Sequence, residues 1–343
     1  MGQRAKCGVA GLSGRMTRVA VPALALALTG CGGGVKAPME HLPEGGAYIV
    51  IDAAKARTSP AVKKGMELSE GGASAGRASF DKMEKAYLSI DMSKGMPALT
   101  GVATGTAGFA AAAATDMKAQ GAAETTVEGR KAIQGKGGPN GGGGYVTELA
   151  DNAVAVFGAP ADLARMTGAA AKKVPAASEK PLFQRAKALS ADHALVIVVD
   201  PAPIMAQAGR GIDQMAQANP AGAAAIRKTE ALTLTADWQT APKVQVTLVG
   251  PAEGRADVVK LLETLKGFAP MMAGAARGQG PGGKLAIGVV GRMEIAEAKD
   301  GVSVTIAWTE DEATGLLGRL DAVKSAGSPM EKAKAAQEAL LGK

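Results

Sequence analysis

The chain has 343 residues, of which 47% are hydrophobic and 21% charged, a composition typical of a globular protein rather than a disordered one. Only 3% of the residues are aromatic. The formal net charge is +7, but four basic residues and no acidic one lie in the first 30 positions. Without that segment the charge is +3 and no cluster of Lys or Arg remains, so we exclude nucleic acid as a partner.

The first recognisable element is the apolar run Val19 to Leu28, which follows the basic residues. It is too short to cross a bilayer as a helix, which needs about 20 apolar residues. A basic flank, a short apolar core and small residues before a cleavage point form the pattern of a secretory signal peptide. Met16 is an alternative start that would give a more compact signal.

The apolar run ends in Leu28-Thr29-Gly30-Cys31, which resembles the lipobox of bacterial lipoproteins. The resemblance implies that residues 1–30 are a signal peptide and that Cys31 becomes a diacylglycerol-modified, usually N-acylated, terminus. Several acyl chains anchor a protein stably where one does not. Gly32 stands where Asp is the usual inner-membrane retention signal of Gram-negative lipoproteins. The resemblance therefore implies a bacterial envelope protein anchored in the outer membrane and facing the periplasm.

The remainder of the chain resembles uncharacterised secreted or envelope lipoproteins and matches no specific family by its motifs. Residues 31–45 are rich in glycine and predict a lipidated tether. The one other cysteine, Cys7, lies in the segment expected to be removed. The body therefore has no thiol for a disulfide, a thiolate metal site or a nucleophile.

The first half of the body predicts strands separated by helices. Ser59-Pro60 and Pro160 are typical helix starts, and alternating apolar residues indicate strands. Strands are predicted at 47–52, 86–92, 99–106, 125–134, 145–149 and 153–157, and helices at 59–68, 107–120 and 160–167.

The second half predicts a similar order of elements. Asn219-Pro220 and Ser328-Pro329 are further helix starts, and Asp300-Gly301 predicts a hairpin turn. The helix expected from Pro251 has an apolar stripe. Strands are predicted at 194–200, 232–238, 244–249, 285–298 and 302–308. The stripe comprises Val258, Leu261, Leu262, Leu265, Phe268 and Met272.

Corresponding landmarks in the two halves are separated by about 148 residues, which predicts an internal duplication. The expected fold class is α+β, with two related domains that each have a mostly antiparallel sheet and helices packed on one face. The expected boundaries are domain 1 at 46–170, a linker at 171–190, domain 2 at 191–327 and a C-terminal helix at 328–343.

Two short motifs suggest chemistry but fail on their context. Gly278 to Lys284 resembles a phosphate-binding loop, yet Leu285 replaces the required hydroxyl residue and a strand, not a helix, is expected to follow. Ser79 to Lys82 matches a Ser-x-x-Lys nucleophile pattern without its partner motifs. We interpret Ser79 as a helix N-cap.

The titratable side chains offer no clear catalytic set. His41 and His193 are the only histidines, and we interpret both as surface or edge residues. Asp52 and Asp200 occupy equivalent positions after strands and are either paired carboxylates or, as we favour, helix caps. No cofactor, metal ligand or catalytic residue is therefore predicted.

The sequence thus favours a membrane-anchored, non-enzymatic envelope lipoprotein with a binding or scaffolding role. Its partner would be another envelope protein or an apolar ligand between the halves. One alternative is a lipid or lipoprotein carrier or chaperone, with a cavity lined by residues such as Phe268, Met271 and Met272. A second alternative is a hydrolase of envelope polymers that uses carboxylates near Asp52 or Asp200.

Overall fold

The computed structural model describes residues 38–60, 62–63, 77–92, 98–136, 143–237, 242–276 and 292–309. The lipobox at 28–31, the loop at 278–285, the side chains of Met271 and Met272, and the expected C-terminal helix lie outside the described residues. Among the described residues, none of the helices has the length and hydrophobicity that a membrane span requires.

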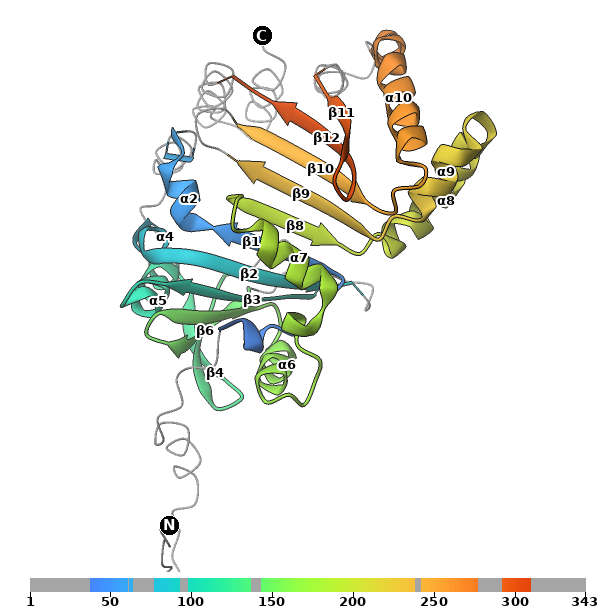
Figure 1. Ribbon diagram of the computed structural model, residues 1–343. Coiled ribbons are helices and arrows are strands. Elements are labelled where there is room, and N and C mark those ends of the chain that lie inside the picture. The colour runs from blue at the N-terminus through green and yellow to red at the C-terminus, as the bar shows by residue number, and fades with distance from the viewer. Residues whose placement is uncertain are drawn as a thin grey trace, which may run out of the picture. The chain divides into compact units, whose positions relative to one another are not determined.

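The described chain alternates strands with helices, as Figure 1 shows. The strands are β1 (Ala47–Asp52), β2 (Met83–Asp91), β3 (Ala98–Gly105), β4 (Ala123–Val127), β5 (Arg130–Gln134), β6 (Tyr145–Ala150), β7 (Ala153–Phe157), β8 (Leu195–Val199), β9 (Ala231–Asp237), β10 (Lys243–Val249), β11 (Glu294–Ala298) and β12 (Gly301–Ala307). The helices are η1 (Pro38–His41), α2 (Ala53–Thr58), α4 (Arg77–Lys82), α5 (Phe109–Ala119), α6 (Pro160–Ala170), η2 (Ala177–Glu179), α7 (Pro181–Leu189), α8 (Ala202–Ala218), α9 (Pro220–Arg227) and α10 (Arg255–Ala276).

The described strands form one sheet in the order β11-β12-β10-β9-β8-β1-β2-β3-β7-β6-β5-β4, and neighbouring strands are antiparallel. This confirms the α+β class with a large antiparallel sheet. The two halves of the chain share this sheet, because β1 of the first half pairs with β8 of the second. The expected domains therefore meet through backbone hydrogen bonds between two strands.

The strand order of the first half recurs in the second. From the centre outward the first half runs β1-β2-β3-β7-β6 and the second runs β8-β9-β10-β12-β11. The first residues of β1 and β8 are Ala47 and Leu195, which are 148 positions apart, and those of β7 and β12 are Ala153 and Gly301, also 148 apart. The first half alone adds the hairpin β4-β5 beyond β6 within the described residues. Descent of both halves from one duplicated unit stays a prediction.

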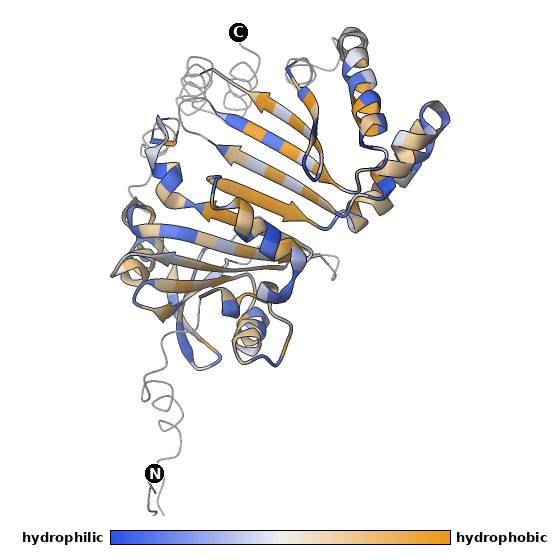
Figure 2. Cartoon of the chain, viewed as in Figure 1, coloured by the Kyte–Doolittle hydropathy of each residue, from blue (hydrophilic) through white to orange (hydrophobic). Residues whose placement is uncertain are grey.

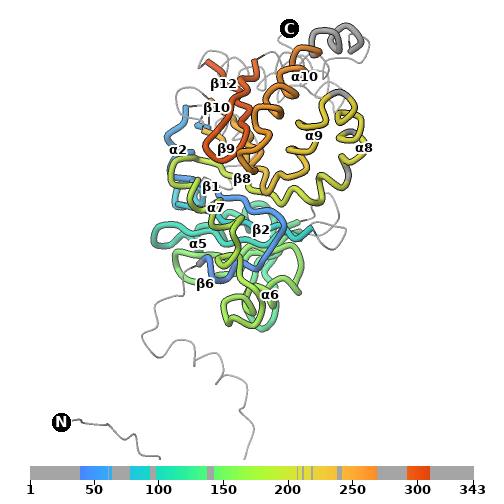
Figure 3. Tube along the Cα trace, turned by 45° about the vertical axis from the view of Figure 1, so that its right-hand side comes forward, coloured from blue at the N-terminus to red at the C-terminus, as the bar shows by residue number. Residues whose placement is uncertain are grey.

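Helices pack against both faces of the sheet. On one face, Phe183 of α7 packs with Tyr48 and Val50 of β1, and the Tyr48 and Phe183 rings lie edge to face with their centroids 5.4 Å apart. On the other face, Phe109 of α5 packs with Ala103 of β3. The helices α8, α9 and α10 lie next to one another in both Figure 1 and Figure 3 and share a core with Val302 of β12.

The segment 171–190, expected as a linker, contributes to the core. It contains η2 and α7, and Phe183 is 1% exposed. Pro181 is the first residue of α7, where a missing N–H costs nothing. The apolar residues of α7 are spaced so that one side of the helix faces the sheet. They are Leu182, Phe183, Ala186 and Leu189.

The segment 31–45, expected as a tether, also overlaps the folded body. Pro38 to His41 forms η1, and Leu42 is fully buried. The carbonyl oxygen of Leu42 accepts a hydrogen bond from the Ala177 N–H at 2.8 Å. Because Met39 and Leu42 are three residues apart, one helical turn brings both into the core that contains Phe183.

Two local elements differ from the expected pattern for identifiable reasons. The run 125–134, expected as one strand, is part of the hairpin β4-β5, because Glu128 and Gly129 have φ of 49° and 74° and form the tight turn. The helix α10 begins at Arg255 rather than Pro251. The caps at Ser59 and Asn219 are confirmed: Ser59 Oγ accepts from Val62 N–H, and Asn219 Oδ1 accepts from Gly222 N–H.

Candidate functional site

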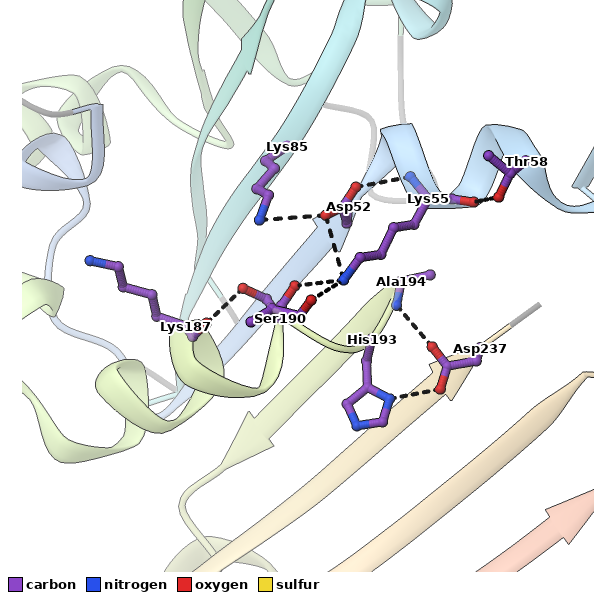
Figure 4. Close-up of polar contacts among 10 residues, drawn as sticks. Asp52, Lys55, Thr58, Lys85, Lys187, Ser190, His193, Ala194 and Asp237 are labelled. Atoms are coloured by element: carbon purple, nitrogen blue, oxygen red, sulfur yellow. Dashed lines mark hydrogen bonds and ion pairs between the residues drawn. The ribbon is translucent and has the colours of Figure 1, made fainter. Parts of the chain in front are cut away.

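The carboxyl end of β1 holds a buried aspartate among basic side chains (Figure 4). Asp52 is 5% exposed, and its Oδ1 accepts a hydrogen bond from the Lys55 N–H at 2.9 Å. Its Oδ2 lies 3.4 Å from Lys85 Nζ and 4.0 Å from Lys55 Nζ. Asp52 therefore caps α2 and balances two lysines, which confirms the interpretation of this residue as a helix cap.

Asp200 lies at the other end of the same pair of strands. Its Oδ1 accepts a hydrogen bond from the Ala202 N–H at 2.9 Å, at the start of α8. Because β1 and β8 are antiparallel, the carboxyl ends of the two strands point in opposite directions, and Asp52 and Asp200 are separated by roughly 15–20 Å of strand. The two residues therefore do not form the paired carboxylates that a shared hydrolytic site would require.

His193 has a carboxylate partner that the sequence did not reveal. Its Nδ1 lies 2.7 Å from Asp237 Oδ2, while Asp237 Oδ1 accepts the Ala194 N–H at 3.1 Å (Figure 4). The pairing arises because β8 and β9 are antiparallel, so the start of β8 lies beside the end of β9. Asp237 is the last residue of β9.

The pairing of His193 with Asp237 fixes the imidazole but does not complete a catalytic triad with the nearby serine. The hydroxyl of Ser190 donates to the carbonyl oxygen of Lys187 at 2.7 Å. A nucleophilic serine would instead direct its hydroxyl to the histidine.

Within the described residues there is also no group of three or more His, Cys, Asp or Glu that could hold a metal ion. His41 ends η1, ahead of β1.

The Ser-x-x-Lys sequence lies on α4, where both of its key residues are engaged. Ser79 is the third residue of α4 rather than its cap, so the predicted N-cap role is wrong. The Ser79 N–H donates at 2.7 Å to Oδ2 of Asp116, a buried residue of α5. The Lys82 amine donates at 2.9 Å to the carbonyl oxygen of Ala107. A carboxylate from a neighbouring helix thus performs the capping that the sequence pattern assigned to Ser79.

One face of the second half of the sheet is lined by branched aliphatic side chains. Strand pairing places alternate residues of each strand on the same face, so the register determines its members. Ala236 and Val302 lie on the same face but are buried, and Val302 shares a core with α8, α9 and α10. We call the partly buried branched residues of this surface the aliphatic face. It comprises Ile49, Leu195, Ile197, Val199, Leu232, Leu234, Val244, Val246, Leu248, Val304 and Ile306.

The opposite face of β9, β10 and β12 carries several hydroxyl side chains beside the buried Ala231 and Val249. It carries Thr233, Thr235 and Ser303, which are buried, beside the partly buried Thr247. The Arg185 side chain of α7 covers part of it, donating to Thr233 Oγ1 at 3.3 Å. Figure 2 shows the resulting alternation of hydrophilic and hydrophobic residues along β10. The hydroxyl side chains Thr233, Thr235 and Ser303 are thus more deeply buried than the residues of the aliphatic face, which is the reverse of the usual order.

The apolar stripe of α10 contains both buried and exposed side chains. Val258 and Leu261 are buried against α9 and β12, as expected of helix core. Leu265 is 43% exposed and Phe268 is 49% exposed. Leu265 and Phe268 of the stripe are therefore not core residues among the described side chains. Ile204 of α8 is also exposed, so the group of helices next to the sheet presents three large apolar side chains to solvent.

Comparison with known proteins finds neither a matching family model nor a matching curated protein. Solved structures with a similar arrangement include TP0453 in crystal form III, with a TM-score of 0.46 and 11% identity over 82% of this chain and 98% of that one. Crystal form I of TP0453 gives a TM-score of 0.42 and 11% identity over 82% of this chain and 97% of that one.

Proposed function

We propose that this protein is a lipid-anchored binding protein of the bacterial envelope and that its body holds an aliphatic ligand on the aliphatic face. The observation that carries the proposal is the reversed burial in β9, β10 and β12. Buried threonines occupy one face, while on the other face the valines, leucines and isoleucines apart from the buried Val302 stay partly exposed. A contiguous exposed apolar surface of this kind marks a binding site more often than a passive surface.

The chemistry of the face indicates the ligand class. Its side chains are branched hydrocarbons without a hydrogen-bonding group, so they select by shape and apolar contact alone. Transfer of apolar surface from water stabilises the bound state by about 25 cal/mol per Å². An acyl chain offers such surface without polar groups that would lose hydrogen bonds on binding. The non-enzymatic role and the absence of a cofactor remain part of the proposal.

The proposed anchor places the ligand source nearby. If Cys31 is acylated, residues 31–37 separate the lipid from η1 and span at most about 25 Å when fully extended. The body would then stay close to the membrane that supplies acyl chains, which raises their effective concentration. Binding by the body and anchoring by Cys31 would thus serve the same function.

A displacement assay tests the proposal with two adjacent residues. Val246 and Thr247 are neighbours on β10 whose side chains lie on opposite faces, so Val246→Lys and Thr247→Lys make the same change on the two faces. The probe is a dansyl-labelled undecanoic acid, added to the full chain and displaced with palmitate. We expect Val246→Lys to weaken probe binding about tenfold or more, because a lysine amine must be desolvated beside the chain. Thr247→Lys should leave binding unchanged.

The opposite results would overturn the proposal. Probe binding that is lost equally in both variants would indicate a general loss of structure, which circular dichroism of the two variants would detect. A folded Val246→Lys variant with unchanged affinity would exclude the aliphatic face as the site. Native mass spectrometry of the protein extracted from cells should also find an acyl-chain ligand, and that ligand should be missing from Val246→Lys.

A further inference from the structure

A cleft of about 570 Å³ lies at the end of the β1–β8 pair opposite to Asp52. The loop before β1 and the segment after α6 form two of its walls, and the ends of β2 and β8 complete it. Its volume is in the range of small-ligand sites. The residues on which the argument depends are Glu44, Asp91, Met92, Arg165, Val174 and Asp200.

The walls are held in place by backbone hydrogen bonds. The Glu44 N–H donates to the Pro175 carbonyl oxygen at 3.2 Å, and the Gly46 N–H donates to the Ile90 carbonyl oxygen at 2.9 Å. The Gly45 N–H donates to Tyr48 Oη at 3.0 Å. The N–H groups of three successive loop residues therefore donate hydrogen bonds to other groups of the protein. The loop is preformed, and its N–H groups are not available to bind an anion.

The polar side chains of the cleft are mainly acceptors. Asp91 Oδ2 lies 3.0 Å from Arg165 Nη2, and Arg165 also lies 3.9 Å from Asp162, so the one guanidinium in the lining is shared between two carboxylates. Glu44 pairs with Lys180 at 2.8 Å on the outer side. Asp200 Oδ1 accepts the Ala202 N–H at the start of α8, whose N-cap residue is Pro201. Of the three lining carboxylates, Glu44 and Asp91 are thus paired with cations, and Asp200 is the one for which the described residues show no ion pair.

The remaining walls are apolar and partly exposed. Met92 is 41% exposed and Val174 is 36% exposed, and both are among the few large hydrophobic residues that the described chain leaves this open. Pro43, Pro175 and Pro203 extend this apolar rim. A lysine or arginine side chain has the matching shape, because its aliphatic stem packs on apolar surface while its charged tip reaches an acceptor.

We infer that this cleft binds a lysine- or arginine-bearing peptide segment of a partner protein. The aliphatic stem of the basic side chain packs against Met92 and Val174, and its cationic tip is received by Asp200. The inference concerns a different surface from the aliphatic face and does not depend on acyl-chain binding.

Fluorescence anisotropy with matched peptides tests the inference on the full chain. The probe is fluorescein-labelled Ala-Lys-Val-Lys-Ala, compared with a peptide in which norleucine replaces both lysines. We expect binding of the lysine peptide only. We expect Asp200→Asn to weaken it about tenfold, because an unpaired acceptor charge is lost. Asparagine keeps an acceptor for the Ala202 N–H at the start of α8, so the fold is kept. Asp213→Asn on the exposed side of α8 is the matched control and should have no effect.

Three outcomes would contradict the inference. Equal binding of the norleucine peptide would show that charge is not recognised. An unchanged affinity in Asp200→Asn would exclude Asp200. Spermidine that binds more tightly than the peptide would identify a free polyamine as the ligand. The displacement of dansyl-undecanoate should be the same in Asp200→Asn and the wild type, so failure of either proposal is seen separately.

Discussion

Ile49 of β1 and Ile197 of β8 face each other directly across the centre of the sheet. They are 148 positions apart, the same separation that relates the first residues of the two strands. Two backbone hydrogen bonds follow the same symmetry. The Asp52 N–H donates to the carbonyl oxygen of Ala194, and the Asp200 N–H donates to the carbonyl oxygen of Gly46, both at 2.8 Å. A local two-fold axis therefore passes through this pair of isoleucines, and the halves join through a continuous ladder.

The continuous ladder predicts that the body unfolds in one cooperative step. Because α7 packs on both β1 and β8, Phe183→Ala should lower the free energy of unfolding by about 3–5 kcal/mol without splitting the transition. Urea unfolding followed by circular dichroism and tryptophan fluorescence measures both quantities. Val174→Ala, at an exposed site, should change stability by less than about 0.5 kcal/mol. Two separate transitions would show that the halves fold as independent domains.

The two equivalent aspartates should differ in their contribution to stability. Asp52→Ala removes a buried helix cap and leaves Lys85 without its partner, so we expect a loss of about 2–3 kcal/mol. Asp200→Ala removes a more exposed cap and should cost about 1 kcal/mol or less. Asp52→Asn keeps an acceptor for the Lys55 N–H, so its loss of stability should lie between those of the two alanine variants. Equal losses in both alanine variants, measured by urea denaturation, would contradict this difference.

Two tyrosines predict loss of stability at high pH. Burial raises the pKa of Tyr48, partly offset by the hydrogen bond from Gly45, and burial together with the charge of Asp52 raises the pKa of Tyr87. A raised pKa means that the folded state favours the protonated phenol. The stabilisation is complete below the ordinary tyrosine pKa of about 10 and is lost as the pH rises through the higher folded value.

The measurement for these tyrosines is the urea midpoint as a function of pH. We expect a steady midpoint near pH 8 and a fall above about pH 10. Tyr48→Phe loses the hydrogen bond to Gly45 and should be about 1 kcal/mol less stable at neutral pH. Its midpoint should fall less steeply above about pH 10, since it has one fewer buried phenol to ionise. A parallel curve for the variant would exclude Tyr48 as a source of the pH dependence.

The proposed anchor depends on Cys31. Cys31→Ser should prevent lipid attachment, because a hydroxyl does not form the thioether that the lipobox resemblance implies. Metabolic labelling with an alkyne-tagged fatty acid should label the wild type and not the variant, and the variant should leave the membrane fraction or remain as precursor. Cys7→Ser, in the segment expected to be removed, is the control and should be labelled normally. Membrane attachment of Cys31→Ser with normal processing would reject the anchor.

Local sequence rules determined the secondary structure at many positions. Alternating apolar residues marked the strands 153–157 and 244–249 within one residue of their ends, and Asn219-Pro220 marked the start of α9. These features depend on neighbours in the chain, so a few residues carry the information. The spacing of the repeated landmarks likewise anticipated the repeated strand order. The lipobox is local in the same sense and remains the basis of the proposed anchor.

Tertiary structure decided which strands meet and which face is covered. Alternation showed that Val246 and Thr247 lie on opposite faces, but only the packing revealed that the neighbouring threonines are buried while the aliphatic side chains stay partly open. The partnership of His193 with Asp237, and the separation of Asp52 from Asp200, depend on antiparallel pairing between strands far apart in the chain. Such pairings follow from burial of whole surfaces rather than from any local motif, which is why the sequence alone determined the elements but not the candidate sites.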